Sequence, residues 1–417
     1  MILNSKVRTD RIGSDIDALA AITEPGRPWT RRAFTPMFLE GRKWLEKAMQ
    51  AAGAVTRIDA AGNLIGTIPG KRPELGTIMV GSHSDTVPDG GRFDGIAGVI
   101  AALEVARALR DQGVVLDHTL EVVDFLAEEV SIFGVSCIGS RGMSGTRPAE
   151  WLARESDGTT LEQGITDVGG DAHGDAVRRD IKAFLELHIE QGPVLQDQKL
   201  DVGVVSAIAG ITRIEIIVDG RADHAGTTPM GSRKDALTTA SWIALGVEEL
   251  GKALASGEGH FAATVGEFEM SPNAANVVPA RVRMLIDARA EVREDMLRFI
   301  DELDKGVVAI AEKTGVTVST PRLVSDNPPT PGDAELIDVL EAACETAGAR
   351  HRRMASGAGH DTAWMARITK SAMIFVPCVD GRSHSPDEFA TSDDIALGAA
   401  VLLDAVKALD TKLQGTE

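Results

Sequence analysis

Short apolar runs that alternate with amphipathic segments constrain the fold of this chain more than any other feature. The run 120–126 is apolar nearly throughout, as a central strand of a parallel sheet is. After the apolar run 77–80 and a glycine-rich loop, Val99, Leu103 and Leu109 recur at helical spacing. Strands are expected at 77–80, 120–126, 181–189 and 372–379, where Pro377 marks an end or an edge, and helices at 37–52 and 96–109. This alternation predicts an α/β fold, with a mixed, largely parallel sheet and helices on both faces.

The pattern changes between residues 209 and 324, where segments follow in the order strand, helix, strand, strand, helix, strand. The strands are expected at 211–218, 262–268, 277–288 and 316–319, and the helices at 235–254 and 294–314. This order is typical of a ferredoxin-like α+β unit. We therefore expect an inserted lid or dimerisation domain at 209–324, which divides the larger catalytic domain into 1–208 and 325–417.

Composition argues against several classes of protein. The chain has 417 residues and a formal net charge of −19, whereas a nucleic-acid-binding surface is basic. No uncharged apolar run approaches the roughly 18 residues of a membrane helix, and the charged residues near the start, from Lys6 onward, leave no apolar core for a signal peptide. Three scattered cysteines indicate a reducing compartment. We therefore expect a cytoplasmic protein that has neither nucleic acid nor membrane as a partner.

Polar side chains gather where the expected strands end. They are His83 and Asp85 after the first strand, Asp94 in the glycine-rich loop that opens the next helix, Glu128 and Glu129 after the second strand, His188 near the end of the third, and His384 after the fourth. Open α/β sheets bind ligands at the carboxyl ends of their strands, so we expect these side chains to meet. Such nitrogen and oxygen ligands suit zinc, manganese or cobalt, and are too rich in nitrogen for calcium.

Taken singly, each of these features has an ordinary structural explanation. A lone histidine is more often a hydrogen-bonded structural residue than a ligand, which is our interpretation of His118, His173, His260 and His351. A glycine-rich loop is commonly a turn. Paired glutamates are usually solvated, but this pair closes an apolar strand, where adjacent charges are costly unless something positive compensates them. The combination at equivalent strand ends therefore favours a metal site.

The candidate ligands outnumber those of one tetrahedral ion, which indicates two ions bridged by a carboxylate. Asp94 suits the bridge because its short side chain is held between glycines. Asp85 is placed to orient the His83 imidazole through its other nitrogen. Of the two glutamates, one can bind metal while the other stays free as a general base. The sequence contains no nucleophile elbow, Walker loop or dinucleotide-binding fingerprint that would suggest other chemistry.

Several stretches of the sequence resemble a known family. They are Gly81-Ser-His-Ser-Asp-Thr-Val-Pro88, Gly90-Gly-Arg-Phe-Asp-Gly95, Glu128-Glu129, Glu186-Leu-His-Ile-Glu-Gln-Gly192, His224-Ala-Gly-Thr-Thr-Pro-Met230, Ser356-Gly-Ala-Gly-His-Asp361 and Ser383-His-Ser-Pro386. The chain resembles the M20-type di-metal amidohydrolases of the hydantoinase/carbamoylase branch, which includes N-carbamoyl-L-amino-acid hydrolases, β-ureidopropionases and allantoate amidohydrolases. His188 indicates the branch, because related peptidases and deacylases generally place a carboxylate at that ligand position.

The resemblance implies a role for each candidate residue. One metal ion would bind His83, Asp94 and His188, the other would bind Asp94, Glu129 and His384, and Glu128 would be the general base. Gln191, Gly357 and Gly359 would approach the substrate, and His224, Asn276 and Arg289 would reach the active site of the partner subunit in a homodimer. The ordinary alternatives are an ion pair of Arg289 with Asp287 or Glu291, and turns at His224 and at the two glycines.

One departure from the family concerns the substrate. Many relatives follow the glutamate pair with Gly-Ser-Arg-Phe, whereas this chain has Val130-Ser-Ile-Phe133 and so lacks that arginine. Our leading hypothesis is hydrolysis of an N-carbamoyl-L-amino acid to the L-amino acid, carbon dioxide and ammonia. The alternatives are allantoate or ureidoglycolate amidohydrolysis, an aminoacylase or peptidase-like activity, and a protein that only stores metal.

Overall fold

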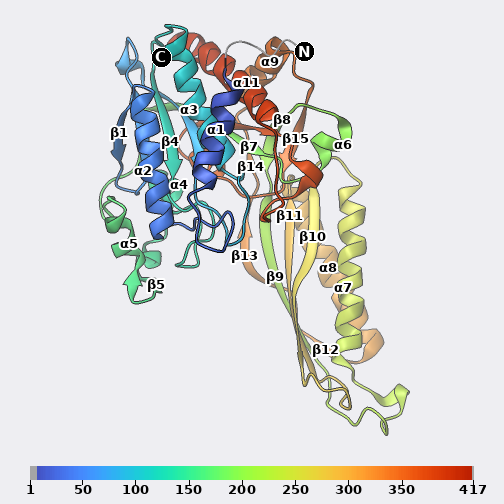
Figure 1. Cartoon of the computed structure of the whole chain (residues 1–417). Helices are drawn as coiled ribbons and strands as arrows, with labels where there is room; N and C mark the ends of the chain where they lie inside the picture. The colour runs from blue at the N-terminus through green and yellow to red at the C-terminus, as the bar shows by residue number, and fades with distance from the viewer. Residues whose placement is uncertain (1–6, 416–417) are drawn as a thin grey trace. The chain divides into compact units, whose positions relative to one another are not determined.

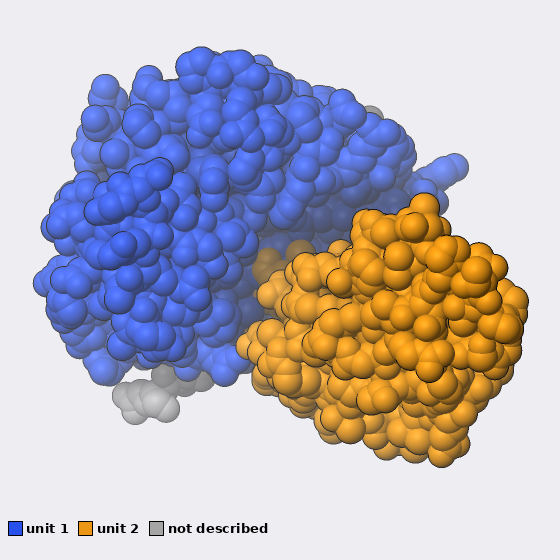
Figure 2. All heavy atoms as spheres, turned by 90° about the horizontal axis from the view of Figure 1, so that it is seen from below, with its two compact units in different colours: residues 1–206, 332–353, 360–417 blue, residues 207–331, 354–359 orange. Residues whose placement is uncertain are grey.

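The computed structural model describes residues 7–415 and forms two compact units. Unit 1 comprises the described residues up to 206, residues 332–353, and those from 360 onward (Figure 2). Unit 2 comprises residues 207–331 and 354–359. Residues 1–6 lie outside the described range. They include Lys6, one of the charged residues from which the absence of a signal peptide was expected. None of the described helices is both long and apolar enough to cross a membrane.

Unit 1 is built on a mixed sheet whose centre is parallel (Figure 1). Its strands are β1 (Val55–Ile58), β2 (Leu64–Ile68), β3 (Thr77–His83), β4 (Thr119–Phe125), β7 (Ile181–Ile189), β8 (Val202–Ile208) and β16 (Lys370–Val376). They lie in the order β1-β2-β4-β3-β7-β16-β8, and β4, β3, β7 and β16 pair in parallel. The outer pairs β1–β2, β2–β4 and β16–β8 are antiparallel. The prediction of a mixed, largely parallel sheet is confirmed.

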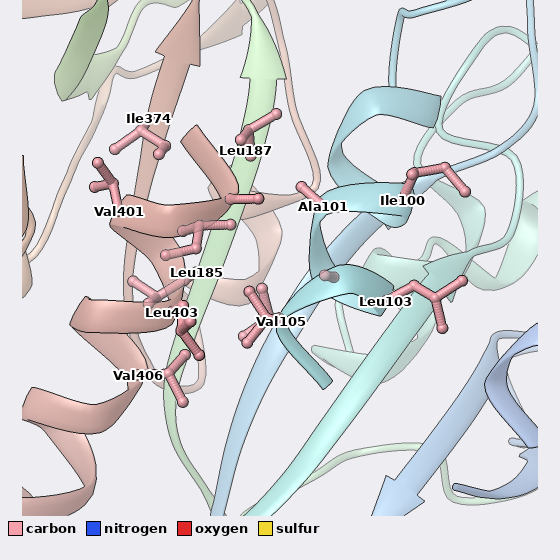
Figure 3. Close-up of a cluster of buried hydrophobic side chains, with 14 of the residues drawn as sticks. Ile100, Ala101, Leu103, Val105, Leu185, Leu187, Ile374, Val401, Leu403 and Val406 are labelled. Carbon is pink, nitrogen blue, oxygen red and sulfur yellow. The ribbon is translucent and has the colours of Figure 1, made fainter. Parts of the chain in front are cut away.

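Long helices pack against one face of this sheet. They are α1 (Thr9–Ala20), α2 (Pro36–Ala51), α3 (Ile96–Asp111), α9 (Ala334–Ala347) and α11 (Ser392–Lys412). Side chains of α3 and α11 meet those of β7 and β16 in the main core, where Leu185 and Leu187 of β7 are fully buried (Figure 3). Phe184, the residue before Leu185, points to the other face, where the short helices α4 (Ile138–Met143) and α10 (Thr362–Met365) contribute Met143 and Met365. Both faces are therefore covered, as the near-continuous apolar runs require.

The other helices and strands, apart from the sheet of unit 2 and its two helices, are short. They are α5 (Leu161–Asp167), α6 (Val194–Gln198), the hairpin of β5 (Glu155–Ser156) and β6 (Thr159–Thr160), β14 (Thr330–Pro331) and β15 (His351–Ser356). The predicted strands and helices of unit 1 are all present, and most differ by a few residues at their ends. Strand β16 ends at Val376, just before Pro377, and has a neighbour on each side, so the proline marks an end and not an edge.

Unit 2 contains an antiparallel sheet with two helices packed on it (Figure 1). Its elements are β9 (Gly210–Asp219), α7 (Ala236–Ala255), β10 (Phe261–Ser271), β11 (Arg281–Ala290), α8 (Arg293–Thr314), β12 (Thr317–Val318) and β13 (Arg322–Asn327). The order β10-β11-β9-β12 is the strand order of a ferredoxin-like unit, with the second and third strands adjacent. Alternate residues of β11, from Val282 to Ala288, are buried beneath the helices.

Two features of unit 2 differ from the sequence expectations. Strand β13, which pairs with β9, was not predicted because its side chains are mostly exposed and lack a period-two apolar pattern. The second difference is the extent of the unit, which includes residues 325–331 and 354–359 where the sequence suggested 209–324 alone. The latter segment belongs to unit 2 partly because the Ala209 N–H donates to the Ser356 carbonyl and Arg289 donates to the Gly357 carbonyl.

The packing of β7 gives a test of the unit 1 core. Leu185→Ala should lower the free energy of unfolding by about 2–5 kcal/mol, because it leaves a cavity between β7 and α11. Val55→Ala, at a position 71% exposed on β1, should change it by less than about 0.5 kcal/mol. Urea denaturation followed by circular dichroism measures both values. Equal effects of the two substitutions would contradict this description of the core.

Candidate metal centre

Two histidines and an aspartate of unit 1 form the first candidate metal group. His83 is the last residue of β3, His188 lies near the end of β7, and Asp94 lies in the loop before α3. Asp94 Oδ1 is 3.2 Å from His188 Nε2 and 3.6 Å from His83 Nε2. All three residues are buried, and the ligand atoms they offer lie within 4.8 Å of one another. The parallel strands β3 and β7 therefore deliver their ends to one point, as predicted.

The same aspartate belongs to a second group. Its other oxygen, Oδ2, is 3.5 Å from His384 Nε2, which is 3.0 Å from Glu129 Oε1. The ligand atoms of Asp94, Glu129 and His384 again lie within 4.8 Å of one another. Each oxygen of Asp94 thus faces a different group, which is the geometry that a bridging carboxylate needs.

Hydrogen bonds determine which ring nitrogen carries the proton in His83 and His188. His83 Nδ1–H donates to the Asp85 carbonyl at 3.1 Å, and His188 Nδ1–H donates to the Ile189 carbonyl at 2.9 Å. In both rings the lone pair is then on Nε2, the nitrogen that faces Asp94. Nε2 of His83 is buried and has no hydrogen-bond partner among the described residues. An unpaired buried acceptor of this kind fits a metal ligand.

Asp85 is more closely engaged with the glutamates than with His83. Its Oδ1 and Oδ2 accept the backbone N–H groups of Glu128 and Glu129, each at 3.2 Å, whereas Oδ1 is 3.5 Å from His83 Nδ1. The expected orientation of His83 by residue 85 therefore comes mainly from the backbone carbonyl. The carboxylate of Asp85 instead fixes the turn after β4, where Ala127 has a positive φ of 54°. This turn places Glu128 Oε2 3.7 Å from His83 Nε2.

The carboxylates of the centre favour positive charge beside them. Hydrogen bonds to Asp94 and Glu129 raise the pKa of His384 to about 11, so these carboxylates favour positive charge at this position. Burial opposes protonation of His83, yet Glu128 and the nearby aspartates raise its pKa well above the ordinary value. Burial raises the pKa of Glu128 well above its usual range. Two divalent cations would supply this compensating charge, and the nitrogen and oxygen donors suit them.

Glycines allow the Asp94 loop to approach the histidines. Gly95 has a φ of +67°, and a Cβ at this position would lie 2.4 Å from the ring of His83. A Cβ at Gly91 would lie 1.9 Å from the Glu388 carboxylate. The glycine-rich loop is therefore required by close packing around Asp94, and it is more than a simple turn.

The sequence indicated no role, or only an approximate one, for four polar residues in and beside this centre. Gln191 Nε2 donates to Asp94 Oδ2 at 2.7 Å, while Gln191 Oε1 is buried without a partner in the described chain. The Ser383 hydroxyl donates to Asp94 Oδ2 at 2.7 Å. Glu388, to which no role was assigned, accepts the backbone N–H groups of Phe93 and Asp94. Asp361 is fully buried and accepts the Ser140 hydroxyl, and the stretch 356–361 was the only sequence signal for it.

The four histidines interpreted as structural residues lie outside the candidate metal groups. His118 hydrogen-bonds with Asp410, His173 with Glu162, and His351 with the Ala349 carbonyl. Neither candidate metal group includes them or His260. The replaced family positions also have ordinary surroundings, because Ile132 packs against an apolar cluster and Val130 is exposed.

Comparison with known proteins identifies the family. The family described as Peptidase family M20/M25/M40 matches residues 79–408, which include every candidate residue above. The chain belongs to this family.

Relatives in this M20 family span nearly the whole chain. The N-carbamoyl-L-amino-acid amidohydrolase of Paenarthrobacter aurescens is 37% identical over 97% of this chain and 99% of its own length. The allantoate amidohydrolase of Escherichia coli K12 is 35% identical over 91% of this chain and 92% of its own length. An amidase of the hydantoinase/carbamoylase family from Burkholderia multivorans, whose crystal structure is known, is 34% identical, with a TM-score of 0.91 over 96% of this chain and 98% of its own. The resemblance to this branch is confirmed, and the chain is a hydrolase of carbon–nitrogen bonds.

The substrate residues that the M20 resemblance implies outside the metal centre lie in unit 2. His224 and Asn276 are neighbours, because the Ala225 N–H donates to the Asn276 carbonyl and His224 forms a β-bridge with Val277. His224 Nδ1 accepts the N–H groups of the turn that follows it. This turn is the ordinary structural role expected as an alternative.

Arg289 and the two glycines also belong to unit 2. Arg289 Nε donates to Asp287 Oδ1 at 2.8 Å, which is the ion pair expected as its alternative role, and Nη1 donates to the Gly357 carbonyl at 2.7 Å. Gly357 faces the ring of His260, whereas a Cβ at Gly359 would meet open space. Arg289 and Gly357 are therefore in direct contact, while Gly359 shows no close approach.

Replacing Gly95 tests the geometry of this M20 metal centre. Gly95→Ala should abolish binding of at least one metal ion, because the new Cβ displaces His83 or the Asp94 loop. Gly113→Ala is the matched control, since Gly113 has a similar φ of +66° but a Cβ added there would meet nothing within 4 Å. Elemental analysis of both purified variants measures the ions retained. Equal metal content in the two variants would refute the close approach at Gly95.

Proposed function

We propose that the protein hydrolyses an N-carbamoyl-L-amino acid to the L-amino acid, carbon dioxide and ammonia, with two divalent metal ions, zinc, manganese or cobalt. The observation that carries the proposal is the pair of candidate metal groups that share Asp94, with His188 in the first and Glu128 beside them. The N-carbamoyl-L-amino-acid amidohydrolase relative, which matches almost end to end, supports the choice of substrate.

Residues of this chain have distinct roles in the proposed reaction. Bound divalent ions supply positive charge that acidifies water and polarises the carbonyl group of the substrate. His83, Asp94 and His188 would hold one ion, and Asp94, Glu129 and His384 the other. Glu128 takes a proton from the attacking water and passes it to the leaving nitrogen. Its buried position, which raises its pKa, suits a group that must accept a proton from water.

Gln191 supports a ureido group as the part of the substrate nearest the ions. Its Oε1 is a buried acceptor without a partner among the described residues, and its amide is held by a 2.7 Å hydrogen bond to Asp94. The terminal NH2 of a carbamoyl group offers the donor that this oxygen lacks, whereas an N-acetyl group offers only a methyl. A buried acceptor left unpaired costs about 1–3 kcal/mol, so the site favours the donor.

We assign the substrate carboxylate to Arg289 and hydrogen bonds to an oxyanion of the reaction to His224 and Asn276, all three reaching the active site of the partner subunit. A guanidinium binds a carboxylate through a planar pair of donors. The hydrogen bonds of Arg289 to Asp287 and Gly357 use Nε and Nη1 and hold the group in place, and Nη2 donates to no described residue. Half-buried Gly357 and exposed Gly359 would let backbone approach the substrate.

The main alternative is allantoate or ureidoglycolate amidohydrolysis. Relatives with these names are also similar to this chain along most of its length, including a ureidoglycolate hydrolase of Oryza sativa at 34% identity over 95% of it. An aminoacylase or peptidase-like activity is less well supported, because His188 occupies a ligand position at which such enzymes generally have a carboxylate.

A substrate panel tests the proposal. The protein, loaded in turn with zinc, manganese and cobalt, is assayed against N-carbamoyl-L-amino acids, allantoate, ureidoglycolate, N-acetyl amino acids and dipeptides. We expect the highest kcat/KM for an N-carbamoyl-L-amino acid. Turnover of allantoate or ureidoglycolate alone would establish the alternative, and turnover of no ureido compound would refute the substrate class.

Glu128→Gln separates catalysis from metal binding. The substitution removes the proton acceptor but keeps a side chain of the same shape, so kcat should fall by at least about 100-fold while both ions remain bound. Turnover assays and elemental analysis of the same sample measure the two effects. A variant that retains kcat would exclude Glu128 as the general base.

We also propose a cytoplasmic homodimer joined through unit 2. Strand β10 is an edge of its sheet over 11 residues, and long unpaired edges favour pairing with another chain. Helix α7, which packs beside β10 (Figure 1), carries Trp242 and Leu245 one turn apart and partly exposed. All three cysteines are free and buried, which suits a reducing compartment.

Charge introduced on α7 tests the dimer. Leu245→Glu should convert the protein to a monomer in sedimentation velocity, because the charge would be buried in the interface. Leu297→Glu, at an exposed position on α8, is the matched control and should leave the dimer intact. A parent protein that sediments as a fully active monomer would refute the proposal.

A further inference from the structure

Glu388 connects the two loops that carry Asp94 and His384. Its side chain is buried, with the residue 1% exposed. Oε1 accepts the backbone N–H groups of Phe93 at 2.8 Å and Asp94 at 3.0 Å. Oε2 lies 2.9 Å from the hydroxyl of Ser383, the residue before His384. One carboxylate therefore holds the backbone of the first loop and a side chain of the second.

The Ser383 hydroxyl extends this contact to the bridging carboxylate. It lies 2.7 Å from Asp94 Oδ2, the oxygen that faces His384. Gly91 is needed for the same arrangement, because a Cβ there would collide with Glu388. Glu388 thus fixes Asp94 through its backbone and, through Ser383, the oxygen of the second candidate group.

The two candidate groups depend on these contacts unequally. His83 and His188 are part of strands β3 and β7, and their rings donate to nearby backbone carbonyls. His384 lies in a loop with a positive φ of 53°, and its side chain is 51% exposed. The group that contains His384 therefore has less support from the sheet than the group that contains His83 and His188.

We propose that Glu388 is a positioning residue that determines the affinity of the Asp94–Glu129–His384 group for its metal ion. This inference rests on the proposed function, because it requires two ions. Polar residues that orient metal ligands typically alter metal affinity by about 10–100-fold when they are replaced. Loss of Glu388 leaves two buried N–H groups unpaired and removes one partner of the Ser383 hydroxyl, so the loop of His384 is held to Asp94 by the Ser383–Asp94 contact alone.

Calorimetric titration of the metal-free protein with cobalt tests the proposal, with the visible spectrum of each bound ion as a second readout. In Glu388→Ala we expect the weaker ion to lose at least about 10-fold in affinity and the tighter ion to change by less than about 3-fold. Glu388→Gln should largely restore binding, because its amide oxygen accepts the two N–H groups and its NH2 donates to Ser383. Ser383→Ala removes only the hydroxyl and should also weaken one ion selectively.

Asp410→Ala is the matched control. Asp410 accepts the backbone N–H groups of Asp117 and His118, at the opposite end of β4 from the metal centre. This variant should lower the melting temperature of the metal-free protein without changing either cobalt affinity. Unchanged cobalt affinities in both Glu388→Ala and Ser383→Ala, equal weakening of both ions, or no recovery in Glu388→Gln would overturn the role of Glu388. A parent that binds fewer than two ions would instead contradict the proposed function.

Discussion

The negative charge gathered around Asp94 is the constraint on which the site of unit 1 depends. The Glu129 carboxylate lies close to it, and those of Glu128 and Asp85 lie beside His83 and the glutamate turn. None of these carboxylates can be buried without a large cost unless positive charge or hydrogen-bond donors face it. The protein provides donors from the backbone after β4, from Gln191 and from Ser383, and it places histidines opposite the remaining oxygens. What these donors leave uncompensated is the charge that two divalent cations would neutralise.

The parallel centre of the sheet makes this concentration of charge possible. Neighbouring parallel strands end at the same edge, so His83 and His188 can be far apart in sequence and still face one aspartate. The apolar faces of β7 are buried between α3 and α11 on one side and short helices on the other. A rigid, doubly covered sheet thus holds the first group, while loops hold the second.

Much of this arrangement could be predicted from sequence because it follows from local patterns. Apolar runs indicated β3, β4, β7 and β16 of unit 1, though not β1, β2 or β8. Polar residues at the ends of those runs indicated His83, Glu129 and His188. Glu388 could not be found in this way, since its partners at Phe93 and Asp94 are almost 300 residues earlier and are backbone groups. Strand β13 was missed for a related reason, because pairing with β9 and not an apolar pattern defines it.

The discontinuity of unit 1 has a consequence for biosynthesis. Strand β16, helix α11 and the loop of His384 come after the whole of unit 2, yet they complete the core and the second metal group. During translation, the earlier part of unit 1 leaves the ribosome without these partners, and the side chains of β7 that pack on α11 stay uncovered until that helix emerges. Unit 2 has an uninterrupted core of its own and can fold in the meantime. The second metal group therefore cannot be complete before the segment that carries His384 has been synthesised.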